Sequence, residues 1–166
     1  MAGGSALGRF KGLLGAGSGS KAVVNLTGSE REQALLLLRD YEESGAGWFW
    51  SSDNEGRITY ISNCVADRMG RRRDQLVGQP VQSLFVLERD EDDTVERTLP
   101  LILSARKTFA ELAVRASMDG DEVWWSLSGR PQFDRSGEFI GYRGNGVDVT
   151  ESRRHQKDAS RLAMYD

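Results

Sequence analysis

The sequence predicts an α+β domain flanked by helical extensions. Strand-like alternation falls into two groups, a pair of short runs within residues 47–62 and three longer runs within 109–149. The segment between these groups shows helical spacing instead. The chain has 166 residues, 39% of them hydrophobic and 28% charged, which suits one domain with extensions.

A polar tail and a short helix are expected before the first strand. Residues 1–28 are dominated by Gly, Ser and Ala, a composition that favours a flexible tail. Ser29 and Glu32 have the spacing of a capping box, and helix-forming residues follow until Gly45. We therefore expect an N-terminal helix over residues 29–45.

The next elements are a hairpin and several helices. The turn sequence 53–56 separates two aromatic and β-branched runs, which predicts a strand pair. Short helices are expected within 63–70 and 73–86, and a longer one over 93–107. Pro100 interrupts the longer segment, so we expect its regular part on one side of the proline.

Three strands and a final helix complete the predicted order. Residues 109–117, 122–133 and 138–149 alternate with period two and are joined by Asp/Gly turns, which indicates an antiparallel meander. Thr150 is expected to cap the helix formed by 150–166, whose few apolar residues suggest that it pairs with another element.

Charge and cysteine content restrict the partners and the compartment. The 22 Lys and Arg residues are outnumbered by 25 Asp and Glu, so the net charge of -3 makes nucleic acid an unexpected partner. Cys64 is the single cysteine and no secretion signal opens the chain, which predicts a cytoplasmic protein. No apolar run approaches the roughly 20 residues of a membrane span, so no membrane insertion is expected.

Two stretches resemble the PAS family. GRITYISNCVADRMGRRRDQLVGQ resembles the opening of a PAS domain, and WWSLSGRPQFDRSGEFIGYRGNGVDVTE resembles its C-terminal half. The resemblance covers about Trp48 to Glu151 and implies a PAS domain over 46–149. It also implies a five-stranded antiparallel sheet with short helices on one face. The final RLAMYD is similar to the segment that precedes diguanylate cyclase (GGDEF) domains.

This resemblance implies a regulatory function. Asp148, Val149 and Thr150 match the motif that couples the last PAS strand to a signalling helix. The expected output is cyclic-di-GMP synthesis or breakdown, carried out by a covalently linked output domain that this module regulates. Two alternatives remain open, a ligand-free dimerisation scaffold and the sensor module of a histidine kinase.

Catalytic and cofactor chemistry is not expected. His155 is the single histidine and lies in the predicted C-terminal helix, away from any partner nucleophile. With one Cys and one His, a zinc site of the usual ligand count is also unexpected. By resemblance, flavin is disfavoured because residues 79–82 lack the reactive cysteine, and Trp125 and Gly146 replace polar amides. Haem is disfavoured because the longer helix contains no histidine.

Alternation of the last two strands predicts which residues face the interior. Trp125 is expected opposite two glycines, where its indole fills the glycine notch or, alternatively, lines a pocket for a small aromatic or apolar ligand. The residues expected to face inward, including the candidate pocket, are Val123, Trp125, Leu127, Gly129, Ile140, Tyr142, Gly144 and Gly146.

A homodimer is expected through the N-terminal helix and the outer sheet face. Leu35, Leu36, Leu37 and Leu38 spread over more of the helix circumference than one core-facing stripe can bury. Trp124 is expected to face outward, covered by the N-terminal helix or contributing to the partner surface.

Overall fold

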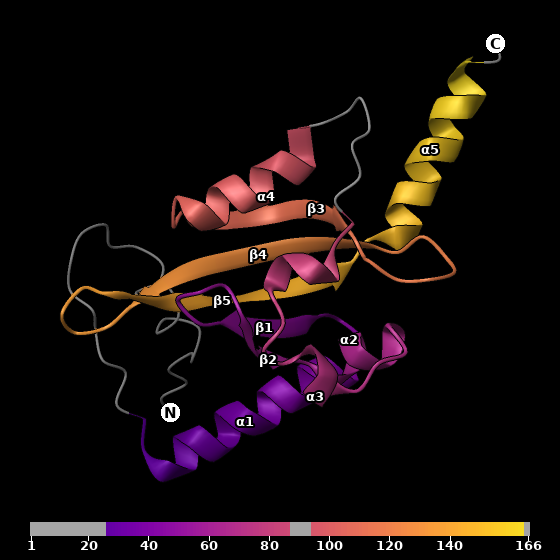
Figure 1. The fold of residues 1–166 in the computed structure, drawn as a ribbon. Helices are drawn as coiled ribbons and strands as arrows, with labels where there is room; N and C mark the ends of the chain where they lie inside the picture. Colours follow the sequence, from indigo (N-terminus) through magenta and orange to yellow (C-terminus); the bar gives the residue numbers. More distant parts are fainter. Residues whose placement is uncertain (1–25, 87–93, 165–166) are drawn as a thin grey trace, which may run out of the picture. The chain divides into compact units, whose positions relative to one another are not determined.

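A computed structural model describes residues 26–86 and 94–164, except for the side chains of 94–98. The chain divides into two units, 1–34 and 35–166. The second contains a five-stranded antiparallel sheet in the order β2-β1-β5-β4-β3, which confirms the predicted hairpin and meander (Figure 1). Its strands are β1 (Trp48–Ser52), β2 (Ile58–Ile61), β3 (Phe109–Arg115), β4 (Trp124–Phe133) and β5 (Phe139–Asp148).

The turns of this sheet are built from aspartates and glycines. In the β1–β2 turn, Asp53 Oδ1 accepts hydrogen bonds from the backbone N–H groups of Glu55 and Arg57, each at 2.9 Å. Gly56 has a φ of 79°, which a side chain would disfavour. Asp134 accepts equivalent bonds in the β4–β5 turn. Local sequence therefore determines both hairpins.

The helices follow the predicted order, with one correction. The longer helix continues through Pro100, and the prediction that its regular part lies on one side of the proline is wrong. Leu99, next to the proline, is only 3% exposed, so burial against the core stabilises this turn despite the lost N–H. The helices are α1 (Gly28–Glu43), α2 (Asn63–Arg68), α3 (Arg73–Leu76), the 3-10 helix η2 (Val81–Leu84), α4 (Thr94–Ser104) and α5 (Thr150–Met164).

The N-terminal helix begins one residue earlier than predicted. Thr27 and Glu30 form the capping box, because the backbone N–H of each donates to the side-chain oxygen of the other at 2.8 and 3.2 Å. The prediction of a capping box between Ser29 and Glu32 is therefore wrong, because the box lies two residues earlier. Gly45, with a φ of 75°, follows the end of the helix as predicted. Most of the expected tail, residues 1–25, lies outside the described residues.

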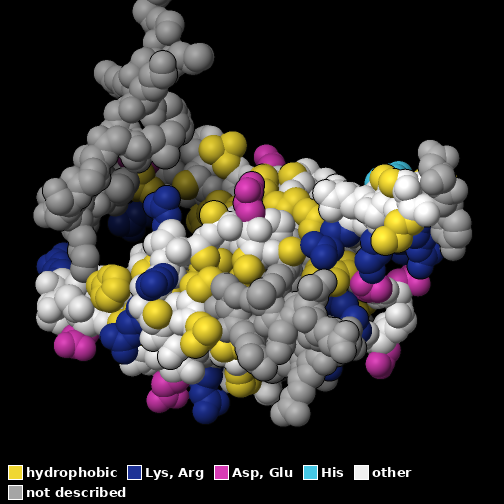
Figure 2. Space-filling view, turned by 90° about the horizontal axis from the view of Figure 1, so that it is seen from above, with side chains coloured by type: hydrophobic (Ala, Val, Ile, Leu, Met, Phe, Trp, Pro, Cys, Tyr) yellow, Lys and Arg dark blue, Asp and Glu magenta, His cyan; other side chains and the backbone are white. Residues whose placement is uncertain are grey.

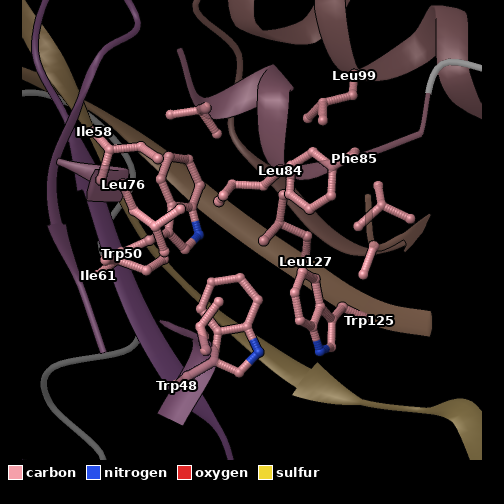
Figure 3. Close-up of a cluster of buried hydrophobic side chains, with 14 of the residues drawn as sticks. Trp48, Trp50, Ile58, Ile61, Leu76, Leu84, Phe85, Leu99, Trp125 and Leu127 are labelled. Carbon is pink, nitrogen blue, oxygen red and sulfur yellow. The ribbon is translucent and has the colours of Figure 1, made fainter. Parts of the chain in front are cut away.

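One face of the sheet packs against the short helices and forms the core (Figure 3). Ile61, Leu76, Leu84 and Leu127 are each at most 1% exposed. The predicted inward alternation of β4 is confirmed, since Val123, Trp125 and Leu127 are all buried. On the other face, the rings of Tyr41 in α1 and Phe49 in β1 lie 5.2 Å apart, measured between centroids.

The inward alternation of β5 does not extend to its first residues. Ile140 is 45% exposed, so its predicted inward position is wrong. The register shifts between Gln132 and Phe133, and Gly141 adopts a φ of 134°. This irregularity turns Ile140 outward and lets Phe139 pack against the core instead.

Candidate functional site

The glycines of β5 form notches for two tryptophans of β1. In the sheet, Gly146 pairs with Trp48 and Gly144 with Trp50. A Cβ atom on Gly146 would overlap the Trp48 ring, and one on Gly144 would lie 2.7 Å from Trp50 Nε1. The expectation that Trp125 fills this notch is wrong, because Trp125 lies opposite Asp148.

Trp125 instead packs among aromatic rings of the core. Its ring makes edge contacts with Trp48 and Phe85, at centroid distances of 5.1 and 6.2 Å. Trp50 stacks on Tyr142 at 6.2 Å and donates a 3.2 Å hydrogen bond to the carbonyl of Ser128. Of the described buried side-chain groups in this core, Trp48 Nε1 has no hydrogen-bond partner. Trp125, Gly144 and Gly146, which were expected to line a pocket, are thus in close contact with other side chains.

The end of β5 and the start of α5 are joined by a compact polar junction. Asp148 Oδ1 accepts a 2.9 Å hydrogen bond from the backbone N–H of Thr150, and its other oxygen lies 4.0 Å from Arg68 of α2. The Thr150 hydroxyl accepts a 3.0 Å bond from the backbone N–H of Trp124 in β4. Asp148, two residues before Thr150, therefore accepts the first N–H of α5, whereas Thr150, the predicted cap, is the first helical residue and ties the helix to the sheet.

A second set of contacts holds the first turns of α5 against β4. The Arg153 guanidinium lies 3.9 Å from the centroid of the Trp124 ring, and Lys157 lies 3.6 Å from Glu122. Trp124 is therefore half-buried beneath α5 rather than α1, and its expected place in a partner surface stays a prediction. Lys and Arg side chains gather on one side of α5 (Figure 2).

Electrostatics reinforce this junction through Glu122. The indole N–H of Trp124 donates a 2.6 Å hydrogen bond to Glu122 and lowers the pKa of that carboxyl group, with Lys157 adding to the effect. The sequence alone did not reveal Arg153 or Glu122 as site residues. Arg153 lies three residues after Thr150, a spacing that places both on one helix face and could have indicated the contact.

A cavity of about 410 Å³ lies at the other end of β5, between the β1–β2 turn, η2 and α4. Of the predicted pocket residues, only Tyr142 lines it. The Tyr142 hydroxyl reaches the carbonyls of Lys107 and Ile102 at 2.8 and 3.1 Å, and burial raises its pKa while nearby Arg106 opposes the shift. Sequence reasoning missed Arg106, which lines this cavity.

Residues 26–86 and 94–164 hold no candidate metal site and no candidate membrane span. No group of three or more His, Cys, Asp or Glu side chains there could hold a metal ion. Within the same described ranges, no helix is long and apolar enough to cross a bilayer. Partial desolvation and the charge of nearby Glu42 raise the pKa of the Cys64 thiol, although part of the residue remains exposed.

The fold and its junction can be compared with known families. The family model described as "PAS fold" matches residues 41–154, which is more than half of the chain. The chain belongs to the PAS family. PAS domains are sensory and non-catalytic modules that are generally regulatory, so the resemblance found in the sequence motifs is confirmed. No curated protein matches the sequence.

Solved PAS structures share this fold at low sequence identity. An RNA-binding light-oxygen-voltage receptor aligns with a TM-score of 0.66 and 14% identity, over 90% of this chain and 41% of the receptor. This PAS chain thus spans about two fifths of that receptor. A light-oxygen-voltage domain studied with a flavin analogue aligns with a TM-score of 0.57 and 18% identity, over 76% and 96% of the two chains.

A third structure comes from a cyclic-di-GMP enzyme. The N-terminal domain of a diguanylate cyclase with a PAS/PAC sensor from Marinobacter aquaeolei aligns with a TM-score of 0.53 and 16% identity. The alignment covers 64% of this chain and 98% of that domain. At these identities the three structures show a common fold only.

Proposed function

We propose that this PAS domain regulates a linked output domain through α5, and that the output is cyclic-di-GMP synthesis or breakdown. The observation that carries the proposal is the junction at Asp148 and Thr150. These residues start α5 directly at the end of β5 and bond it to the neighbouring strand β4. A change in the spacing of β4 and β5 would therefore alter the direction of α5.

The size of the required change is modest. A shift of α5 between two positions needs a signal that binds one state more tightly by only a few kcal/mol. A few contacts like those at the Asp148–Thr150 junction contribute a comparable free energy. The Lys157–Glu122 pair lies at the surface and is weak enough to break during signalling. The Arg153–Trp124 stack is half-buried, and Arg153 Nε has no hydrogen-bond partner among the described residues. The buried Thr150 bond would act as the pivot.

The cyclic-di-GMP output is supported by two likenesses. The RLAMYD ending is similar to the segment before GGDEF domains, and a PAS sensor of a diguanylate cyclase has the same fold. The test is the parent gene beyond Asp166. A cyclase or phosphodiesterase signature is expected there, whereas a phosphoacceptor-histidine helix would replace this output with a kinase.

We further propose that the domain works in the cytoplasm as a homodimer. Leu35, Leu36, Leu37 and Leu38 are 66%, 52%, 68% and 44% exposed, which leaves an apolar helix surface for a second copy. A twofold contact there would pair equivalent helices and bring the two output domains together.

A ligand-free scaffold is the second candidate function. It is favoured by the packing of Trp48 and Trp50 into the glycine notches, which leaves no room for a ligand opposite Gly144 and Gly146. Native mass spectrometry separates the two candidates, since a sensor retains or takes up a small molecule and a scaffold does not.

A further inference from the structure

The cavity beside Arg106 is distinct from the expected interior pocket. Its volume of about 410 Å³ falls within the range of about 300–1,000 Å³ usual for small-molecule sites. Apolar side chains from three elements form part of its wall, including Val81 of η2, Leu103 of α4 and Phe139 of β5. This surface suits a small apolar group.

The polar part of the wall carries opposite charges on different elements. Arg106 follows α4 and, within the described part of the chain, has no carboxylate within ion-pair distance. Asp53 and Glu55 belong to the β1–β2 turn, where Glu55 pairs with the exposed Arg57 at 3.4 Å. Ser104, beside Arg106, makes no hydrogen bond through its hydroxyl to the described residues. A cation and two carboxylates thus line one cavity.

The backbone at Arg106 has a conformation unusual for a residue with a side chain. The N–H of Arg106 donates to the carbonyl of Leu103, and the N–H of Lys107 to that of Ile102, which together form a Schellman motif. The left-handed position of this motif usually holds glycine, yet here Arg106 has a φ of 54°. Its guanidinium carbon lies 4.6 Å from the centroid of the Phe139 ring, which positions the charge at the cavity wall.

We propose that this cavity binds an amino acid with an apolar side chain. The ligand carboxylate would pair with Arg106 and Ser104, and its ammonium group would face Asp53 and Glu55. Its side chain would lie against the apolar wall. A carboxylic acid without the ammonium group would be repelled by the turn carboxylates, and an amine without the carboxylate would leave Arg106 unpaired.

This ligand class deepens the regulatory function proposed above. Only the physiological meaning of the binding depends on that function, because binding itself is measured on the isolated chain. Binding is measured on the chain itself by calorimetry, with L-phenylalanine as probe and phenylpropanoate and phenethylamine as matched analogues. L-phenylalanine should bind. Each analogue should bind at least about tenfold more weakly, because each lacks one charged contact. Amide chemical shifts of Leu103 and Phe139 should move on titration.

Variants separate the site from general folding effects. Arg106→Gln and Arg106→Gly should weaken L-phenylalanine binding about tenfold or more, and Arg106→Gly also relieves the left-handed backbone. Glu55→Gln should weaken binding of the amino acid but not of phenylpropanoate. Arg130→Gln, an exposed arginine of β4 outside the cavity, should leave affinity unchanged. Wild-type affinity in both Arg106 variants, or no binding to the wild-type chain at millimolar L-phenylalanine, would overturn the proposal without affecting the role of α5.

Discussion

Adding one methyl group at Gly144 or Gly146 tests whether the interior is filled. In Gly146→Ala the new Cβ meets only side-chain atoms of the Trp48 ring, whereas in Gly144→Ala it meets Trp50 Nε1 and the backbone of Ser128 and Gly129, which adjusts less easily than a side chain. Overpacking of this kind costs about 1–3 kcal/mol, so we expect Gly146→Ala at the lower end and Gly144→Ala at the upper end. In a domain of this size, each kcal/mol lowers the melting temperature by about 4 °C.

Urea denaturation and thermal melting measure the effect, with Gly28→Ala as a control because nothing lies within 4 Å of its new Cβ. Trp48→Phe, which shrinks the opposing ring, should partly rescue Gly146→Ala, with a coupling free energy of at least about 0.5 kcal/mol. If both alanine variants match the wild-type stability, the space around the glycines is open. The filled-core reasoning would then be refuted in favour of an interior pocket.

Further predictions concern the junction, the dimer and cofactors. Thr150→Val removes the acceptor for the backbone N–H of Trp124 and should destabilise the fold by about 1–3 kcal/mol in urea denaturation. Thr59→Val, at an exposed site, should destabilise it less, and equal losses in the two variants would contradict this prediction. Because the pKa of Glu122 is lowered below its ordinary 4.5 in the folded protein, its contribution is present above that pH and lost as pH falls through the folded-state value. Denaturation at about pH 3 to 6 should show a shallower loss of stability in Glu122→Gln, and identical pH profiles would argue against the contact. Light scattering should show a dimer, which the double variant Leu35→Lys with Leu37→Lys should dissociate. The control Leu101→Lys, at a side chain 68% exposed, should leave the dimer intact. A wild-type monomer at tens of micromolar would end the dimer proposal. The purified protein should be colourless, and a stoichiometric visible absorption band would reveal a flavin or haem.

Element order could be read from the sequence because it depends on local chemistry. Period-two alternation and Asp/Gly turns lie within a few residues of each other, so they predicted the β1–β2 hairpin and the meander of β3, β4 and β5. The motif ending at Thr150 also located the start of α5. The PAS family and its regulatory character followed from the same motifs.

Contacts between distant residues were decided only by the tertiary structure. Alternation showed that Trp125 and the glycines of β5 share a face, but strand order and register determine that Trp48 and Trp50 of β1 fill the notches. Likewise, the outward position of Trp124 was predictable, whereas its cover by Arg153 depends on the direction in which α5 leaves the sheet. The cavity beside Arg106 combines a helix end with a turn about fifty positions earlier in the chain, a juxtaposition that no local pattern encodes because it arises from the packing of α4 and η2 against β1 and β5.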